Sequence, residues 1–199
     1  GDVGIDHALI ASSNDNTIQL STGCLCCTVH GDLVETIREL TLKRSSGDIR
    51  PFDSIVIETT GLADPGPIIQ ALMTAPVARR YRFRQAIAAV DAVQGLSTLD
   101  RYAEARKQAA IADDIVITKT DLGSGAFNEL KTRLRAMNPA ARLRSSALNA
   151  IPMPSEFFRG DVYDPATKST EVREWLNIEG YPQEPSSSDH GHDHRSANR

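Results

Sequence analysis

Three cysteines lie within four residues of one another near the start of the chain. Cys24, Cys26 and Cys27 fall in the run TGCLCCT. Residues so close in sequence rarely reach the geometry of a mutual disulfide, so the cluster favours metal or thiolate chemistry. Three thiolates can bind a thiophilic ion such as zinc or cuprous copper, with a fourth ligand from elsewhere. Two alternatives stay open: small buried apolar side chains, and a redox site, although the spacing is not C-x-x-C.

An acidic residue and then a glycine follow the apolar run at residues 55–57. Glu58 would sit at the carboxyl edge of a sheet, where nucleotide hydrolases hold the shell of Mg²⁺, and Gly61 would let a main-chain amide approach a terminal phosphate. We expect these two residues to form the catalytic part of such a site. The alternative is an ordinary strand that ends in an acid and a turn.

A second polar loop follows the apolar run at residues 115–117. It contains Thr118, Lys119 and Asp121 in the segment TKTD. A carboxylate can accept hydrogen bonds from N1 and N2 of guanine, a donor pair that adenine does not present, while a lysine stem covers the base. Ser146 and Ala147 follow the next expected strand and would supply backbone amides to the base. The alternative is a solvated charged turn.

Alternating strands and helices are expected to position these residues. The expected strands are residues 17–20, 54–58, 86–90, 115–118 and 141–144, and the expected helices between them are residues 32–43, 67–74, 103–112 and 126–137. This order predicts an α/β fold with a mostly parallel sheet covered on both faces, in which ligands bind beyond the carboxyl ends of the strands. The loops after Glu58, Asp91 and Thr118 are therefore the expected site.

The composition is that of a globular domain without a nucleic-acid or membrane surface. The chain has 199 residues, 40% of them hydrophobic, which suits one domain with a core. Its 22 basic and 26 acidic residues give a net charge of -4, so no broad positive field is available to hold a nucleic acid. No apolar stretch approaches the roughly 20 residues that cross a bilayer, and a cytoplasmic protein is expected.

Read together, the motifs resemble the nucleotide-binding domain of the CobW family, whose relatives include the HypB and UreG metallochaperones among the P-loop GTPases. The resemblance runs from residue 1 to about residue 150. It rests on GDVGID at residues 1–6, GCLCC at 23–27, IVIETTGLADP at 55–65, VDA at 90–92, ARKQAAIADDIVITKTDL at 105–122 and NPAA at 138–141. The order and spacing of GCLCC, ETTGLADP and TKTDL are highly specific.

The resemblance implies a three-layer P-loop NTPase-like fold and a role for each motif. Glu58 and Gly61 fall on the family's Walker B element, and Lys119 and Asp121 fall on its guanine-recognition motif, with Thr118 where GTPases often have asparagine. The three cysteines fall on the metal-binding motif. Asp2 falls near the acidic positions of the first switch, and we expect it close to the thiolates as a further metal ligand.

The chain also departs from the family pattern. It contains no G-x-x-x-x-G-K-[ST] motif, which cradles the phosphates and which the family places before the point where this chain begins. We therefore expect a fold incomplete at its N-terminus and a chain cut at both ends. Residues 1–159 are expected to form the partial nucleotide-binding domain, and residues 160–199 a linker with a short helix near 170–176 and a disordered His-rich tail.

The resulting functional hypothesis is a GTP-hydrolysing metallochaperone. It would bind GTP with Mg²⁺, carry a divalent metal, zinc or else cobalt, and deliver that metal to a client metalloprotein, whereas the chain alone would be inactive as a GTPase. A nucleotide-independent metal buffer, which uses the cysteines and the tail histidines, is the alternative, and a thiol oxidoreductase is a third reading. The sequence does not identify the client, and it leaves a homodimer open.

Overall fold

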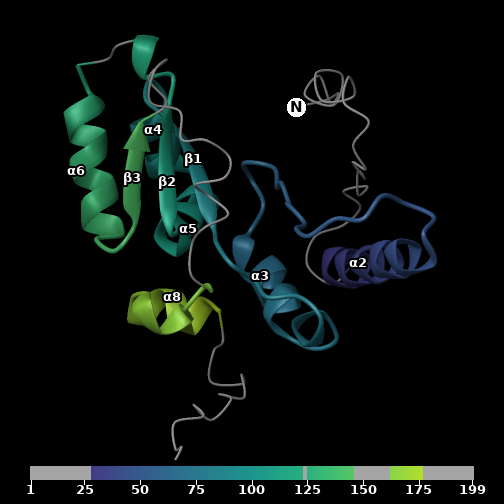
Figure 1. Cartoon of the computed structure of the whole chain (residues 1–199). Helices are drawn as coiled ribbons and strands as arrows, with labels where there is room; N and C mark the ends of the chain where they lie inside the picture. Colours follow the sequence, from purple (N-terminus) through teal and green to yellow (C-terminus); the bar gives the residue numbers. More distant parts are fainter. Residues whose placement is uncertain (1–27, 123–124, 146–161, 177–199) are drawn as a thin grey trace, which may run out of the picture.

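The sheet of the protein is parallel, and helices connect its strands. The computed structural model describes residues 28–122, 125–145 and 162–176. Strands β1 (Ile87–Asp91), β2 (Asp114–Thr118) and β3 (Arg142–Ser145) pair in the order β1-β2-β3, all parallel. The expected strands at residues 86–90, 115–118 and 141–144 are thus confirmed, and so is the α/β class with a parallel sheet (Figure 1).

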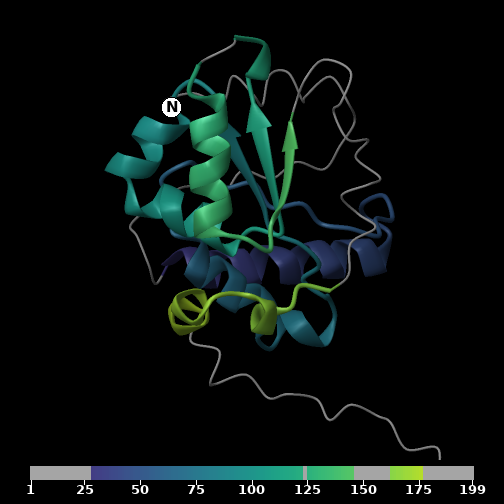
Figure 2. The same cartoon turned by 90° about the vertical axis from the view of Figure 1, so that its left-hand side faces the viewer.

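One face of the sheet packs against three helices: α4 (Gly95–Arg101), α5 (Ala103–Ile111) and α6 (Phe127–Met137). Ile115 and Ile117 of β2 share a buried core with Leu130 and Leu134 of α6, and all four are at most 1% exposed. Figure 2 shows α6 running alongside the strands. Parallel strands need crossover helices, and burying these side chains is the main stabilisation of that arrangement.

A close approach of backbone to side chains fixes the start of α4. A Cβ atom on Gly95 would lie 2.9 Å from a methyl of Val90 and 3.1 Å from two methyls of Leu130. Glycine therefore allows the helix to pack closely between β1 and α6. Helix α4 was not expected from the sequence, because a segment of seven residues with a glycine and few apolar side chains is too short to show a helical pattern.

A second group of helices lies beside the sheet. Helix α3 (Pro65–Met73) packs against α2 (Thr28–Ser46) and the short 3₁₀ helix η1 (Val77–Arg79), and it also contacts α5. Helix α8 (Thr170–Trp175), preceded by η3 (Pro165–Thr167), covers α3 and α5 at the end of the molecule where the strands begin (Figure 2). These helices confirm the expected ones at residues 32–43, 67–74 and 170–176, with α2 longer than expected.

The expected strand at residues 54–58 is wrong. This segment is neither helix nor strand and belongs to no sheet of the described residues. The alternation of buried and exposed side chains in this segment has a different origin. Ile55 and Ile57 pack against the core of α2 and α3, while Val56 is 73% exposed. A period of two sets which side chains are buried, but a strand also needs a neighbouring backbone with which to pair. The expected strand at residues 17–20 lies outside the described residues.

A buried ion cluster closes the N-terminal side of the sheet. Asp114 is 0% exposed, and it pairs with Arg142 at 2.7 Å and with Arg144 at 2.6 Å, while Gln85 also donates to it. Burial by itself raises the pKa of Asp114, but the hydrogen bonds and charges of the two arginines outweigh it and hold the pKa below its usual value. A carboxylate charge is thus kept inside the sheet.

Candidate functional site

Strands β1 and β2 end side by side, which brings two of the expected loops together. Asp91, the last residue of β1, is in register with Thr118, the last residue of β2. The amide of Ala92 donates to the Thr118 carbonyl at 2.9 Å, and the Thr118 hydroxyl lies 3.5 Å from the Val90 carbonyl. The expectation that the loops after Asp91 and Thr118 meet at one edge of the sheet is confirmed.

Lys119 is held in a defined position by Asp91. Its Nζ lies 2.6 Å from Asp91 Oδ2, and its backbone has a φ of 56°, in the left-handed region that few residues other than glycine adopt. The other oxygen of Asp91 accepts hydrogen bonds from the amides of Val93 at 2.7 Å and Gln94 at 3.0 Å. The lysine bond, followed by the Gln94 amide, lowers the pKa of Asp91. Asp91 therefore stays ionised and anchors the lysine.

Asp121 lies one turn further along, in the 3₁₀ helix η2 (Thr120–Leu122). It is exposed, and its carboxylate accepts no hydrogen bond from any residue that the structure describes. The amide of Leu122 donates to the Lys119 carbonyl at 3.2 Å, and the Ser145 hydroxyl at the end of β3 lies 3.2 Å from that of Thr120. The loop is thus joined to β3, and the Asp121 carboxylate is available to a ligand.

The loop with Glu58 and Gly61 is held by contacts of its own. Both residues are exposed, and Glu58 does not end a strand, contrary to expectation, because its segment has no pairing partner in the described residues. The amide of Ala63 donates to the Thr60 carbonyl at 3.0 Å and closes a turn around Gly61. No hydrogen bond or ion pair within the described ranges joins this loop to Lys119 or Asp121.

The remaining expected site residues lie outside the described residues. These are Cys24, Cys26, Cys27 and Asp2 of the metal site, and Ser146 and Ala147 of the base-binding loop. Thr28, the first residue of α2, directly follows Cys27, so the end of the cysteine motif adjoins a helix. Within residues 28–122, 125–145 and 162–176, no three histidine, cysteine or acidic side chains cluster as metal ligands would.

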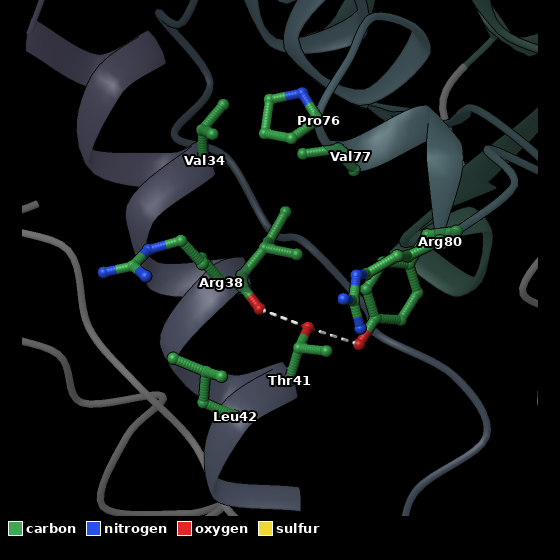
Figure 3. Close-up of a pocket in the computed structure, with 9 residues that line it drawn as sticks. Val34, Arg38, Thr41, Leu42, Pro76, Val77 and Arg80 are labelled. Atoms are coloured by element: carbon green, nitrogen blue, oxygen red, sulfur yellow. Dashed lines mark hydrogen bonds between the residues drawn. The ribbon is translucent and has the colours of Figure 1, made fainter. Parts of the chain in front are cut away.

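A groove lies between α2 and η1, away from the β1–β2 edge. It measures about 300 Å³ and is lined mainly by apolar side chains, with Arg38 and Arg80 at its rim (Figure 3). Thr41 lies within it, 2.8 Å from the Tyr81 hydroxyl. Of the expected site residues that the structure describes, none lines this groove.

Two residues have roles that were not expected from the sequence: Asp91, which was named only as the residue before a site loop and which anchors Lys119, and Gln108 of α5, which donates to the loop around Gly61. A signal for Asp91 existed, since it ends a strand parallel to the one that ends at Thr118. Nothing in the sequence marked Gln108, because it contacts the carbonyl of Ala63, 45 residues away, and the sequence does not predict how α5 faces that loop.

Comparisons with known proteins give a family and a set of relatives. The model of the CobW/HypB/UreG nucleotide-binding domain matches residues 1–144. The zinc chaperone YjiA of Escherichia coli (strain K12) is 37% identical over 142 residues, which is 71% of this chain and 44% of that protein. The zinc-regulated GTPase metalloprotein activator 1 of Schizosaccharomyces pombe is 27% identical over 161 residues, 79% of this chain and 38% of that protein.

The fold agrees with a solved structure. The Zn(II)-bound YjiA GTPase of E. coli superimposes with a TM-score of 0.60 and 32% identity over 69% of this chain and 43% of the other, which confirms the P-loop NTPase-like fold. The chain spans less than half the length of these relatives. No helix in the described parts of the chain is long and apolar enough to cross a membrane. The chain belongs to the CobW/HypB/UreG family, and its residues 1–144 match the nucleotide-binding domain of that family.

Proposed function

We propose that the protein to which this chain belongs binds and hydrolyses GTP and uses the cycle to deliver zinc to a client metalloprotein in the cytoplasm. The observation that carries the proposal is the sheet edge where Lys119 is anchored by Asp91 while the Asp121 carboxylate is left available. The names of the relatives support it, because they describe zinc chaperones and a zinc-regulated GTPase.

The residues at this edge fit a guanine base. The Asp121 carboxylate can accept from N1 and N2 of guanine, and it has no competing donor among the described residues. The side chain of Lys119 is 59% exposed, so its methylene stem can lie along the base while its ammonium stays on Asp91. Thr118 supplies a hydroxyl where many GTPases supply an amide, and Ser146 and Ala147 would add backbone amides.

The phosphate end requires more than these 199 residues contain. Glu58 would orient the Mg²⁺ shell, and the Gly61 amide would sense the γ-phosphate. Mg²⁺, when bound, neutralises the developing charge on the phosphates. Because positioning and electrostatic stabilisation supply nearly all catalysis in such enzymes, and no G-x-x-x-x-G-K-[ST] motif occurs in this sequence, the chain alone hydrolyses GTP negligibly.

The cysteine motif is the proposed site for the cargo metal. Cys24, Cys26 and Cys27 provide two or three thiolates, and Asp2 or water completes an open site suited to transfer. Binding releases protons and weakens as the pH falls, since the ligand is the thiolate. The competing function is a metal buffer that does not use nucleotide, and the histidines of the tail at residues 190, 192 and 194 favour it.

The test of guanine recognition is Asp121→Asn in a protein that contains this chain together with a phosphate-binding loop, hereafter the loop-containing protein. An amide donates as well as accepts, so GTP affinity should fall and affinity for xanthosine triphosphate should rise. Asp53→Asn, whose side chain is fully exposed, is the matched control. Unchanged GTP affinity with no gain for xanthine would make Asp121 a surface turn residue.

The test of the metal site is chelator competition for zinc on three proteins. These are the chain as given, a version that ends before Ser186, and a Cys26→Ser/Cys27→Ser variant. We expect tight binding to be lost with the cysteines and kept without the tail. Zinc binding that survives the cysteine changes and vanishes with the tail would contradict the assignment and favour the buffer.

A further inference from the structure

Helix α5 holds the loop around Gly61 through the side chain of Gln108. Its Nε2 lies 2.8 Å from the carbonyl oxygen of Ala63, 3.3 Å from that of Gly61 and 3.4 Å from that of Thr60. The Ala63 bond has ordinary hydrogen-bond length, and the two longer contacts share the remaining donor capacity of the amide. One side chain thus touches three consecutive or near-consecutive carbonyls of a loop that belongs to no helix or strand.

These contacts and the bond of 3.0 Å from the Ala63 amide to the Thr60 carbonyl together set the direction of the loop's amides. The carbonyl of Thr60 and the N–H of Gly61 belong to the same planar trans peptide unit, so they point in opposite directions. With the Thr60 carbonyl facing Gln108 on α5, the Gly61 N–H faces away from the helix. No described residue accepts a hydrogen bond from that N–H. The amide is therefore available for a ligand on the side of the loop opposite to α5.

The residue before Gln108 holds the other end of the loop. Lys107 Nζ lies 2.5 Å from Asp64 Oδ2, while Asp64 Oδ1 caps α3 by accepting from the Gly66 amide at 3.0 Å. Lys107 also lies 5.7 Å from the ring centre of Trp175 in α8. Because α3, α5 and α8 share one buried core, the loop is attached to a packed unit of three helices and not to a flexible neighbour.

We infer that Gln108 is a positioning residue for nucleotide sensing: it keeps the Gly61 N–H directed toward the γ-phosphate, and Lys107 fixes the end of the same loop on Asp64. This inference rests on the proposed function. Gln108 itself does not contact the nucleotide in this arrangement. Its effect on binding is therefore confined to the phosphate that the Gly61 amide contacts. Discrimination between GTP and GDP should depend on Gln108, whereas recognition of guanine should not.

The experiment compares two affinities in the loop-containing protein, for GDP and for a non-hydrolysable GTP analogue. Gln108→Glu keeps the shape of the side chain but removes its donor, and Gln108→Ala keeps the helix propensity of α5. We expect the affinity for the analogue to fall about tenfold in both variants, as for the loss of one hydrogen bond to a charged group, with little change for GDP. Asn128→Asp, an amide-to-acid change at an exposed position of α6, is the matched control.

Hydrogen exchange separates the possible failures. In the nucleotide-free chain, the amide of Ala63, which donates to the Thr60 carbonyl, should exchange faster in both Gln108 variants than in the parent or the Asn128→Asp control. Equal loss of GDP and analogue affinity, with a lower denaturation midpoint, would make Gln108 a structural residue and overturn the inference. The inference would also be overturned if the parent protein distinguishes GDP from the analogue and the Gln108 variants distinguish them equally well. A parent protein that binds no guanine nucleotide would overturn the proposed function itself.

Discussion

A buried asparagine sets the junction between α5, α6 and the sheet, and its removal should be costly. Asn138 is 4% exposed, and its Nδ2 donates to the carbonyls of Ala109, Ala110 and Ala112, each at 2.9 Å. Its Oδ1 accepts from the Ala141 amide at 3.1 Å. The last carbonyls of a helix have no partner within that helix, so this side chain supplies the donors that the C-terminus of α5 requires.

The magnitude follows from the bonds that are lost. Asn138→Ala removes three net hydrogen bonds, two from the hydrogens of the side-chain amide and one to its oxygen, although the Ala112 carbonyl keeps the Lys168 ammonium at 3.1 Å and the Ala141 amide keeps the Asn138 carbonyl at 3.4 Å. At about 1 kcal/mol for each net hydrogen bond the free energy of unfolding should fall by roughly 3 kcal/mol. For a chain of this size the thermal midpoint should fall by about 6–12 °C. Asn138→Asp has almost the same shape, but its carboxylate would face three carbonyl oxygens. It should cost at least as much as the alanine variant.

Denaturant titration of the parent chain and the two variants measures these differences. Asn128→Ala and Asn128→Asp on the exposed face of α6 are the controls, and they should lie within about 0.5 kcal/mol of the parent. If the aspartate variant were as stable as the parent, shape and packing would explain the site, and the hydrogen-bond reasoning would be refuted.

Three further outcomes are expected. Asp91→Asn keeps the oxygen that accepts the two amides but loses the ion pair with Lys119, and it should lower the free energy of unfolding by only about 0.5 kcal/mol because the lysine is largely exposed. In urea titrations from pH 7 to pH 3, this difference from the parent should vanish as the pH falls through the lowered pKa of Asp91. Gly95→Ala should destabilise the protein by about 1–3 kcal/mol because its Cβ would overlap side chains of β1 and α6. Gly31→Ala in α2, whose Cβ would have nothing within 4 Å, should instead stabilise it by about 0.5–1 kcal/mol, and thermal melting measures both changes. Asp114→Asn should lower the urea midpoint at neutral pH, and the penalty should shrink in acid, because a carboxylate with a lowered pKa contributes stability above about pH 4 and loses it as the pH falls through the folded-state pKa.

The sheet and its helices could be predicted because each has a local signal. The apolar runs of β2 and the helical spacing of Leu130 and Leu134 in α6 are periodic in the sequence itself. The strand expected at residues 54–58 had the same kind of signal and was still wrong. Alternation reports that one face is buried, and here the burying surface is a pair of helices and not a neighbouring strand.

The two ends of the candidate site differ in what determines their geometry. At the guanine end, the loop begins at the last residue of a paired strand, so the register of Asp91 with Thr118 already places Lys119 and Asp121 at a known edge of the sheet. At the phosphate end, the loop around Gly61 leaves an unpaired segment, and its conformation depends on Gln108, which lies 45 residues beyond Ala63. Sequence order cannot determine that contact. A loop held by a few side-chain hydrogen bonds is also easier to displace than one held by a strand, as a segment that responds to nucleotide requires. The proposed guanine end, fixed by paired strands, and the proposed phosphate end, held by side chains of α5, therefore suit the constant and the changing part of a nucleotide cycle.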